Sequence, residues 1–419
     1  MCNAIAGQLI VCVHQDDRAA MDVLEQIRQD QIPHVRIIES LVDRLSDLKL
    51  KERKTKYWFY RLAVPEGQEI FKIGYLQFFY KHAVLKAVAN GYMNPDVLNW
   101  TNLHMQIVPN SYLSVRQSSA AGVGFAATSD HDEYKKLCKV DQASSTAGSW
   151  RRVLVLDTGL DSSSSANVVE RKNIVDPNNT NDVTDDNGHG TAVVEIIHDI
   201  APETEFLVYK VADEDGRASE WDTLLALMAD TDADIINVSL AFGLGDITCS
   251  VCGRESHASR SAVFENVLNE LAEYSSAPLI VAAAGNGSLL ELSYPARFSH
   301  VIAVESINKT KELSDFTNRG AVTEDGSAHN NVFVMPGGER TGTNDPTEYV
   351  GTAANGNRFW GTSFAAAYAS GLIAALWSES KHDSKDAASL LDHLRSHADH
   401  DSLPNYLYET HGNGMMQFL

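Results

Sequence analysis

The 419-residue sequence contains only five cysteines, and it lacks any apolar run of the 18 or more residues that a membrane span requires. So few and scattered cysteines exclude a disulfide framework. The N-terminal stretch "MCNAIAGQLIVCVHQDD" has no basic segment ahead of its short apolar core, so residues 9–13 are predicted to form a β-strand rather than a signal peptide. Together these features favour a cytoplasmic protein outside the membrane, with secretion as the alternative.

Basic residues are also scarce. The chain has 34 Lys and Arg against 56 Asp and Glu, a formal net charge of −22. Residues 1–140 are nearly balanced, with 17 basic and 15 acidic residues, whereas residues 141–419 contain 17 and 41. Because phosphate binding depends on basic patches, the acidic part argues against a nucleic-acid partner. The length and the change near residue 140 predict two domains.

Residues 1–116 are predicted to form a smaller α+β domain. Asp17 can cap a helix after the first strand, and aromatic-rich segments at 57–64 and 70–80 are expected to be strands. A second amphipathic helix is expected through Ile38, Leu41, Val42, Leu45 and Leu48. No family is recognised in residues 1–115 from the sequence.

Two further segments have no catalytic pattern. The basic run "KLKERKTK" at 49–56 is either a solvated helix end or a patch that binds a partner. Residues 117–150 are rich in small and polar side chains, which predicts a linker.

From residue 151 onward, short apolar strands alternate with helical segments. The predicted strands read "RVLVLD", "TEFLVYKV", "ADIINVSL", "PLIVAAAG" and "HVIAVESI". Nearly continuous apolar strands separated by helices indicate a parallel sheet with both faces covered, and ligands of such sheets bind beyond the carboxyl ends of the strands.

Four polar residues lie in or beside such positions: Asp157, His189, Asn286 and Ser363. Each has an ordinary structural interpretation, as a helix cap, an incidental histidine, an Asn-Gly turn or a packed small residue. Together they have a chemical one. A serine hydroxyl becomes nucleophilic when a histidine accepts its proton and a carboxylate orients that histidine. An asparagine amide and a helix N-terminus can stabilise the oxyanion that forms.

The motifs "LDTG", "NGHGT", "AAAGN" and "GTSFAA", in this order, resemble those of the subtilisin-like serine peptidases, the subtilases. The similarity covers about residues 151–419. It implies an α/β fold, a parallel-sheet three-layer sandwich preceded by the smaller domain. It also implies that Asp157 orients His189, the general base, that Ser363 attacks, and that Asn286 stabilises the oxyanion.

The same resemblance assigns substrate-binding residues for a protein or peptide substrate. One edge of the cleft is expected at Ser239, Leu240 and Ala241, and the other at Gly216, Arg217, Ala218 and Ser219. The pocket for the residue before the scissile bond is expected to be lined by Ala283, Ala284, Gly285 and Ser293. Main-chain pairing of an extended peptide would give affinity, and the pockets would give selectivity.

Several positions depart from the family pattern. Glu195 replaces a packing glycine, Ala367-Tyr368 replaces Pro-His, and Ala241-Phe242 replaces Gly-Gly on the cleft edge. Arg217 and Glu220 would charge the opposite lip. A narrower, charged cleft predicts a sequence-selective peptidase.

No cofactor or metal is predicted. The continuous "EIIHDIAPETEF" lacks the calcium-binding insertion of many secreted subtilases, although a calcium ion could be held elsewhere. Cys249 and Cys252, near His257, form a C-x-x-C pair without a second pair. Free thiols are therefore expected there, with a disulfide or a partial metal site as the alternatives.

Two alternatives stay open. The N-terminal domain (1–116) could be a propeptide that the enzyme removes, or a retained regulatory or targeting domain that binds a partner protein. The fold could also serve as a catalytically silent scaffold, although such a protein has no physical need to keep all four site residues.

Overall fold

The structure is a computed structural model. It describes residues 4–66, 68–69, 71–73, 75–77, 80, 105–114, 124–176, 178–242, 246–248, 255–257, 261–274, 276–322, 327–340, 346–379 and 386–419. The chain divides into two compact units. Unit 1 comprises Met1–Tyr112, Ser219–Asp230 and Gly243–Val267, and unit 2 comprises Leu113–Ala218, Thr231–Phe242 and Leu268–Leu419.

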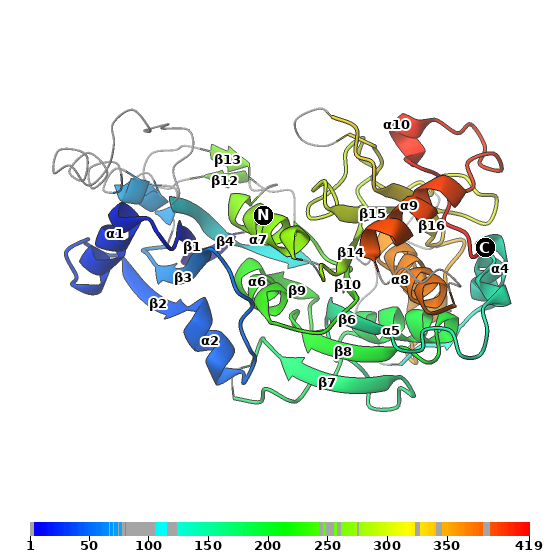
Figure 1. The fold of residues 1–419 in the computed structure, drawn as a ribbon, viewed down its shortest axis with the longest axis horizontal. Helices are drawn as coiled ribbons and strands as arrows, with labels where there is room; N and C mark the ends of the chain where they lie inside the picture. Colours follow the sequence, from blue (N-terminus) through cyan, green and yellow to red (C-terminus); the bar gives the residue numbers. More distant parts are fainter. Residues whose placement is uncertain are drawn as a thin grey trace. The chain divides into compact units, whose positions relative to one another are not determined.

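Unit 2 is built on a seven-stranded sheet in which every neighbouring pair is parallel (Figure 1). The strand order is β16-β15-β14-β10-β6-β8-β7. The strands are β6 (Arg152–Asp157), β7 (Asn167–Asn173), β8 (Glu205–Lys210), β10 (Ile235–Val238), β14 (Leu279–Ala283), β15 (Val301–Ile307) and β16 (Val332–Pro336). The predicted α/β parallel-sheet fold is confirmed. All residues of β10, β14, β15 and β16 are buried, so the sheet is covered on both faces.

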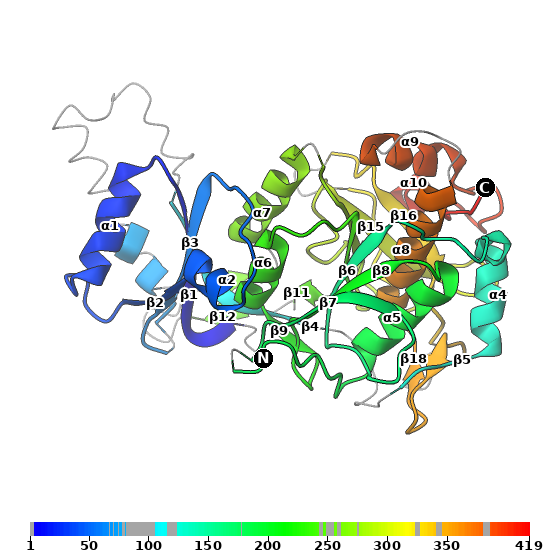
Figure 2. The ribbon, with the colours of Figure 1, turned by 60° about the horizontal axis from the view of Figure 1, so that its bottom comes forward.

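Two helices of unit 2, α5 (His189–Ile200) and α8 (Thr362–Glu379), pack against each other and against the sheet (Figure 2). Helix α8 is buried around its whole circumference from Thr362 to Trp377. An apolar helix without a polar face is stable only when it is enclosed in this way. The first turns of α5 and α8 therefore have positions that are set by packing.

The described part of the predicted linker, residues 124–150, is folded. It contains β5 (Ala126–Ala127), α4 (Ser129–Leu137) and the 3₁₀ turn η2 (Val140–Gln142). Tyr134, Cys138 and Ala147 are fully buried in the core of unit 2. The linker prediction is therefore wrong for this stretch, because a few large side chains among many small ones are enough to anchor it.

The remaining elements of unit 2 are short. They are β11 (Ala241–Phe242), β17 (Gly351–Thr352), β18 (Arg358–Phe359), α9 (Ala387–His397) and α10 (Tyr408–His411). Strand β9 (Arg217–Ser219) and helix α7 (Ala262–Glu273) each have residues in both units.

Unit 1 contains an antiparallel sheet in the order β4-β1-β3-β2. Its elements are β1 (Ala4–His14), α1 (Arg18–Arg28), β2 (Arg36–Ser40), α2 (Leu41–Asp47), β3 (Tyr57–Ala63), the first eight residues of β4 (Met105–Ser114), α6 (Glu220–Met228), β12 (Asp246–Thr248) and β13 (Glu255–His257). The expected strand at 9–13 and the Asp17 cap are both present.

Two predictions for this unit are wrong. The second helix begins only at Leu41, after a Ser40 cap, and Ile38 lies in β2. The described residues of 70–80 are helical rather than extended, and Lys72, Leu76 and Tyr80 are buried at a spacing of four. Aromatic content suggested a strand there, but the burial has the period of a helix.

The basic run at 49–56 binds the end of a helix in the same unit. The backbone N–H and Nε of Arg53 donate to the carbonyl oxygens of Met228 and Ala229, each at 2.9 Å, and Lys51 forms an ion pair with Asp230. The last carbonyl groups of a helix have no partner within it and attract cations. The observed partner of this run is thus helix α6.

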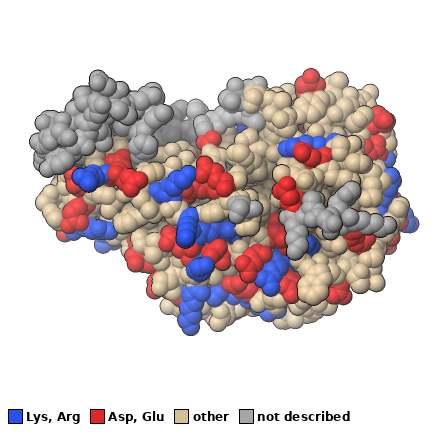
Figure 3. Space-filling model, viewed as in Figure 1, with Lys and Arg blue, Asp and Glu red and all other residues tan. Residues whose placement is uncertain are grey.

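Acidic and basic side chains are interspersed on the face seen in Figure 3. Among the described residues, no helix is long and apolar enough to cross a membrane.

If residues 129–147 belong to the core, Tyr134→Ala should destabilise the protein by about 3–5 kcal/mol, as expected for removing a large buried aromatic side chain. The exposed neighbour Lys136→Ala is the matched control and should change stability by less than about 0.5 kcal/mol. Thermal unfolding followed by circular dichroism measures both. Equal midpoints for the two variants would contradict the assignment.

Candidate active site

Asp157 and His189 meet at the carboxyl end of β6. Asp157 is the last residue of that strand, His189 is the first residue of α5, and each is 1% exposed. His189 Nδ1 lies 2.8 Å from Asp157 Oδ1. Because an ionised carboxylate only accepts, Nδ1 carries the hydrogen and Nε2 is left as the proton acceptor.

Two glycines allow this close approach. Gly188 caps α5 with φ +90°, in the left-handed region. A Cβ on Gly190 would lie 2.4 Å from the carbonyl oxygen of Gly159 and 3.1 Å from Cβ of Asp157. The helix can therefore begin against the strand end only with glycine at residue 190.

The buried carboxylate of Asp185 organises the loop before His189. Oδ1 accepts from Thr158 Oγ1 and from the backbone N–H groups of Asn187 and Gly188, and Oδ2 accepts from the N–H and Oγ1 of Thr191, at 2.7–3.1 Å. Sequence reasoning missed Asp185, although the Asp-Asp-Asn-Gly turn chemistry of residues 185–188 was an available signal.

Ser363 lies in the first turn of α8 and is 4% exposed. Its Oγ donates to the carbonyl oxygen of Ser239 at 3.2 Å. The ring of Phe364, the next residue, lies 5.2 Å from the ring of His189. The first turn of α8, which carries the candidate nucleophile, thus lies beside the ring of His189, while the Ser363 hydroxyl itself is bonded to the predicted cleft edge.

Asn286 follows β14 and is held by Thr362. Its Oδ1 accepts from the backbone N–H and from Oγ1 of Thr362, both at 2.9 Å. Thr362 Oγ1 also accepts from the N–H of Gly285. Because Oδ1 faces Thr362, the amide presents Nδ2 as its donor. Sequence reasoning missed Thr362, although it directly precedes Ser363.

The end of the predicted cleft edge, at Ala241, is paired with the protein's own chain. The last two residues of β4 run antiparallel to β11, with Ser114 opposite Ala241 and Leu113 opposite Phe242. Both pairs lie within unit 2. Leu113 is fully buried, so the strand that pairs with this end of the edge is packed into the protein.

On the other predicted edge, Gly216 forms a turn with φ +72° ahead of β9. Arg217 is exposed and pairs with Asp215, Ala218 is buried, and Ser219 caps α6. The expectation that Glu220 charges a lip is wrong, because this side chain is only 1% exposed. Its place in the first turn of α6 directs it into the protein.

The predicted pocket residues are buried side by side. Ala283 ends β14, followed by Ala284 and Gly285, and the N–H of Ser293 donates to the carbonyl oxygen of Ala284 at 2.8 Å. A Cβ on Gly285 would lie 2.5 Å from Ser293 Oγ.

Two departures from the family pattern have structural partners. Glu195 accepts from Ser164 Oγ. Tyr368 bonds to the buried His131 of α4, whose other ring nitrogen lies 2.9 Å from Asp199 Oδ2 on α5. The hydrogen bond from His131, with help from Lys135, lowers the pKa of Asp199. Helix α4 is thereby tied to both helices that carry candidate catalytic residues.

Within the described ranges, no group of three or more His, Cys, Asp or Glu side chains is arranged to hold a metal ion. Cys249 and Cys252 lie outside the described residues, as does the side chain of His257. Among the described residues, Cys12 and Cys138 are buried and form no disulfide.

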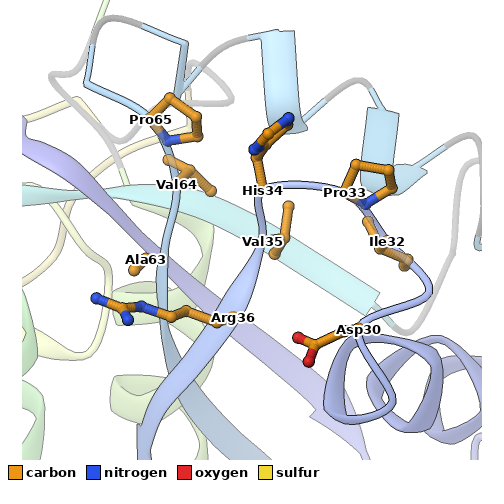
Figure 4. A pocket seen from close by; sticks show the side chains of 9 residues that line it. All are labelled: Asp30, Ile32, Pro33, His34, Val35, Arg36, Ala63, Val64 and Pro65. Atoms are coloured by element: carbon orange, nitrogen blue, oxygen red, sulfur yellow. The ribbon is translucent and has the colours of Figure 1, made fainter.

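A cavity of about 390 Å³ lies in unit 1, and none of the residues that line it is a predicted site residue (Figure 4). Asp30, His34 and Arg36 lie beside apolar side chains in its lining, which comprises Asp30, Ile32, Pro33, His34, Val35, Arg36, Ala63, Val64 and Pro65.

Comparison with known proteins agrees with these motifs. Residues 84–414 match the model of the subtilase family. The chain is 29% identical to the major intracellular serine protease of Bacillus subtilis over 54% of its length and 67% of the relative's. It is also 29% identical to the minor extracellular protease Epr of B. subtilis, over 59% of this chain and 36% of the relative, and to subtilisin DY of Bacillus licheniformis, over 62% and 89%.

The family match covers well over half of the chain. The four motifs lie at the carboxyl ends of strands in one parallel sheet or in the first turns of helices packed on it. The chain belongs to the subtilase family, and its class is that of the subtilisin-like serine endopeptidases.

Proposed function

We propose that the whole chain hydrolyses peptide bonds of protein substrates through Asp157, His189, Ser363 and Asn286. The observation that carries the proposal is the buried Asp157–His189 hydrogen bond, placed beside the first turn of α8. It leaves His189 Nε2 as a base, as a serine nucleophile requires.

In the proposed reaction, Ser363 rotates about its Cα–Cβ bond from Ser239 toward His189 Nε2. Oγ attacks the substrate carbonyl carbon and His189 takes its proton. The oxyanion accepts from Asn286 Nδ2 and from the Ser363 N–H, which as one of the first four of the helix has no partner within it. His189 then gives the proton to the leaving amine, and water hydrolyses the acyl-enzyme by the same steps.

We further propose that residues 1–116 control access to this site. A peptide that binds by strand addition needs the edge of Ser239–Ala241, and β4 pairs with that edge. From Leu113 to Ser114 the chain advances toward Ser239, so β4 occupies the place of an extended substrate. Selectivity for particular sequences would come from Ala241 and Phe242, which replace two glycines.

No metal or cofactor takes part in the proposed reaction, and a calcium ion elsewhere remains open. The compartment we propose is the cytoplasm, with secretion as the alternative. The relatives include a protease named as intracellular and one named as extracellular, so cell fractionation is the direct test. A regulatory protein partner for residues 1–116 also remains a proposal.

A fluorophosphonate probe tests the proposed nucleophile. We expect wild type to be labelled and Ser363→Ala to be unlabelled and inactive on fluorescein-labelled casein. Asn286→Ala should turn over about 10²–10³-fold more slowly, because one oxyanion donor is lost. Equal labelling of wild type and Ser363→Ala would contradict the assignment, and no labelling of folded wild type or of the Leu113 variant described next would favour the silent scaffold.

Control by β4 predicts that Leu113→Asp speeds labelling of the uncut chain. A charged side chain at this fully buried position disfavours pairing with β11 and opens the edge. Ser114→Ala, which leaves the backbone pairing intact, is the control and should be labelled at the wild-type rate. Unchanged labelling of Leu113→Asp would show that β4 does not block the site.

Self-processing can be followed in the same preparations by intact-mass spectrometry. If residues 1–116 are a propeptide, wild type should lose a fragment cut between about residues 117 and 150, whereas Ser363→Ala should remain whole. An intact wild-type chain that is nevertheless labelled would indicate a retained domain.

A further inference from the structure

The loop between Gly285 and Ser293 carries Asn286, and its shape decides where the amide points. The loop leaves β14 at Gly285, with φ +107°, and passes through Ser288, with φ +56°. Neither value is helical or extended, so the backbone groups of the loop need partners from outside it.

Asn318 supplies three of these partners. Its Oδ1 accepts from the N–H groups of Gly287 at 2.8 Å and Leu289 at 3.1 Å, and its own N–H donates to the carbonyl oxygen of Gly285 at 2.8 Å. Its Nδ2 donates to Ser293 Oγ at 2.9 Å. Asn318 is 1% exposed, and it binds the loop on both sides of Asn286 and at its far end.

The contact leaves little room for a side chain at either glycine that flanks Asn286. A Cβ on Gly285 would lie 2.6 Å from Asn318 Nδ2, and a Cβ on Gly287 would lie 3.1 Å from its Oδ1. The amide of Asn318 therefore fits between the two glycines that flank Asn286.

Asn318 is itself anchored to the sheet. Thr317 Oγ1 accepts from the N–H of Ser306 at 3.0 Å, and the N–H of Gly320 donates to Glu305 Oε1 at 2.8 Å. Ser306 and Glu305 both lie in β15, which is next to β14. Hydrogen bonds thus hold the segment around Asn318 to β15, and Asn318 in turn binds the loop.

We propose that Asn318 is a positioning residue for the oxyanion site, acting through the backbone of Asn286. The inference rests on the proposed function. Thr362, the first residue of α8, fixes the side-chain oxygen of Asn286. Asn318, whose neighbours Thr317 and Gly320 are bonded to β15, fixes the main chain on both sides of Asn286. A neutral amide suits this role, because it satisfies donors and an acceptor together without adding negative charge near the oxyanion.

The test is a double-mutant cycle in the full-length chain, with initial rates on fluorescein-labelled casein. Asn318→Ala should lower kcat about tenfold or more, within the 10²–10³-fold cost of losing the donor itself, and should leave KM within about twofold. In an Asn286→Ala background the same change should lower kcat by less than about twofold, because two residues that act as one unit are not additive.

Asn331→Ala is the matched control. Asn331 is a buried asparagine whose Nδ2 donates to the carbonyl oxygen of Ser299, and it directly precedes β16, at the amino ends of the strands. Both variants should lower the unfolding temperature, but only Asn318→Ala should lower kcat. If Asn318→Ala does not fold, the same cycle is measured with Asn318→Ser, in which a hydroxyl replaces the amide.

A normal kcat for the folded Asn318 variant, or effects that multiply in the double variant, would overturn the inference while wild type is labelled by the fluorophosphonate. An unlabelled wild type would instead overturn the proposed function, so the two failures are distinguishable.

Discussion

The burial of helix α8 is the constraint on which the site depends. Sixteen consecutive residues, Thr362–Trp377, have no exposed face, so small side chains are needed where neighbouring elements approach. A Cβ on Gly371 would lie 3.0 Å from Cβ of Ile200, at the end of α5. Because α5 and α8 pack on each other and on the same sheet, the positions of His189 and Ser363 are set by one interface. A close-packed interface resists small shifts of its side chains, which keeps His189 and Ser363 in place.

Packing places the helices and strands, and buried polar side chains then shape the loops between them. Asp185 satisfies five donors around the turn before His189, and Thr362 orients the amide of Asn286. Asp185 acts on residues next to His189, and Thr362 acts on Asn286 itself, so neither is placed to act on a substrate. A loop with unusual dihedral angles holds its shape only when its backbone groups are paired in this way.

In the proposed function, inhibition and substrate binding use the same backbone groups. Strand β4 makes main-chain bonds to β11 that any extended peptide would make, so a substrate must displace it. Such bonds carry no sequence information. Discrimination between β4 and a substrate therefore falls to side chains such as Leu113, which is buried at this edge.

Local sequence determined five of the seven strands of the parallel sheet and the order of the motifs, because long apolar runs and glycine-flanked polar residues have strong local signals. It did not determine the strands β7 and β16, that the described residues of 70–80 are helical, that α4 is part of the core, or that Glu220 is buried. Those outcomes depend on which surfaces meet after folding. The hydrogen bond between Asp157 and His189 was predictable from the family motifs, whereas Thr362 as the partner of Asn286 and Ser239 as the partner of Ser363 were not. The roles of Asp185, Thr362 and Asn318 were not predictable either, since a hydrogen bond between residues far apart in sequence exists only once tertiary packing has brought them together.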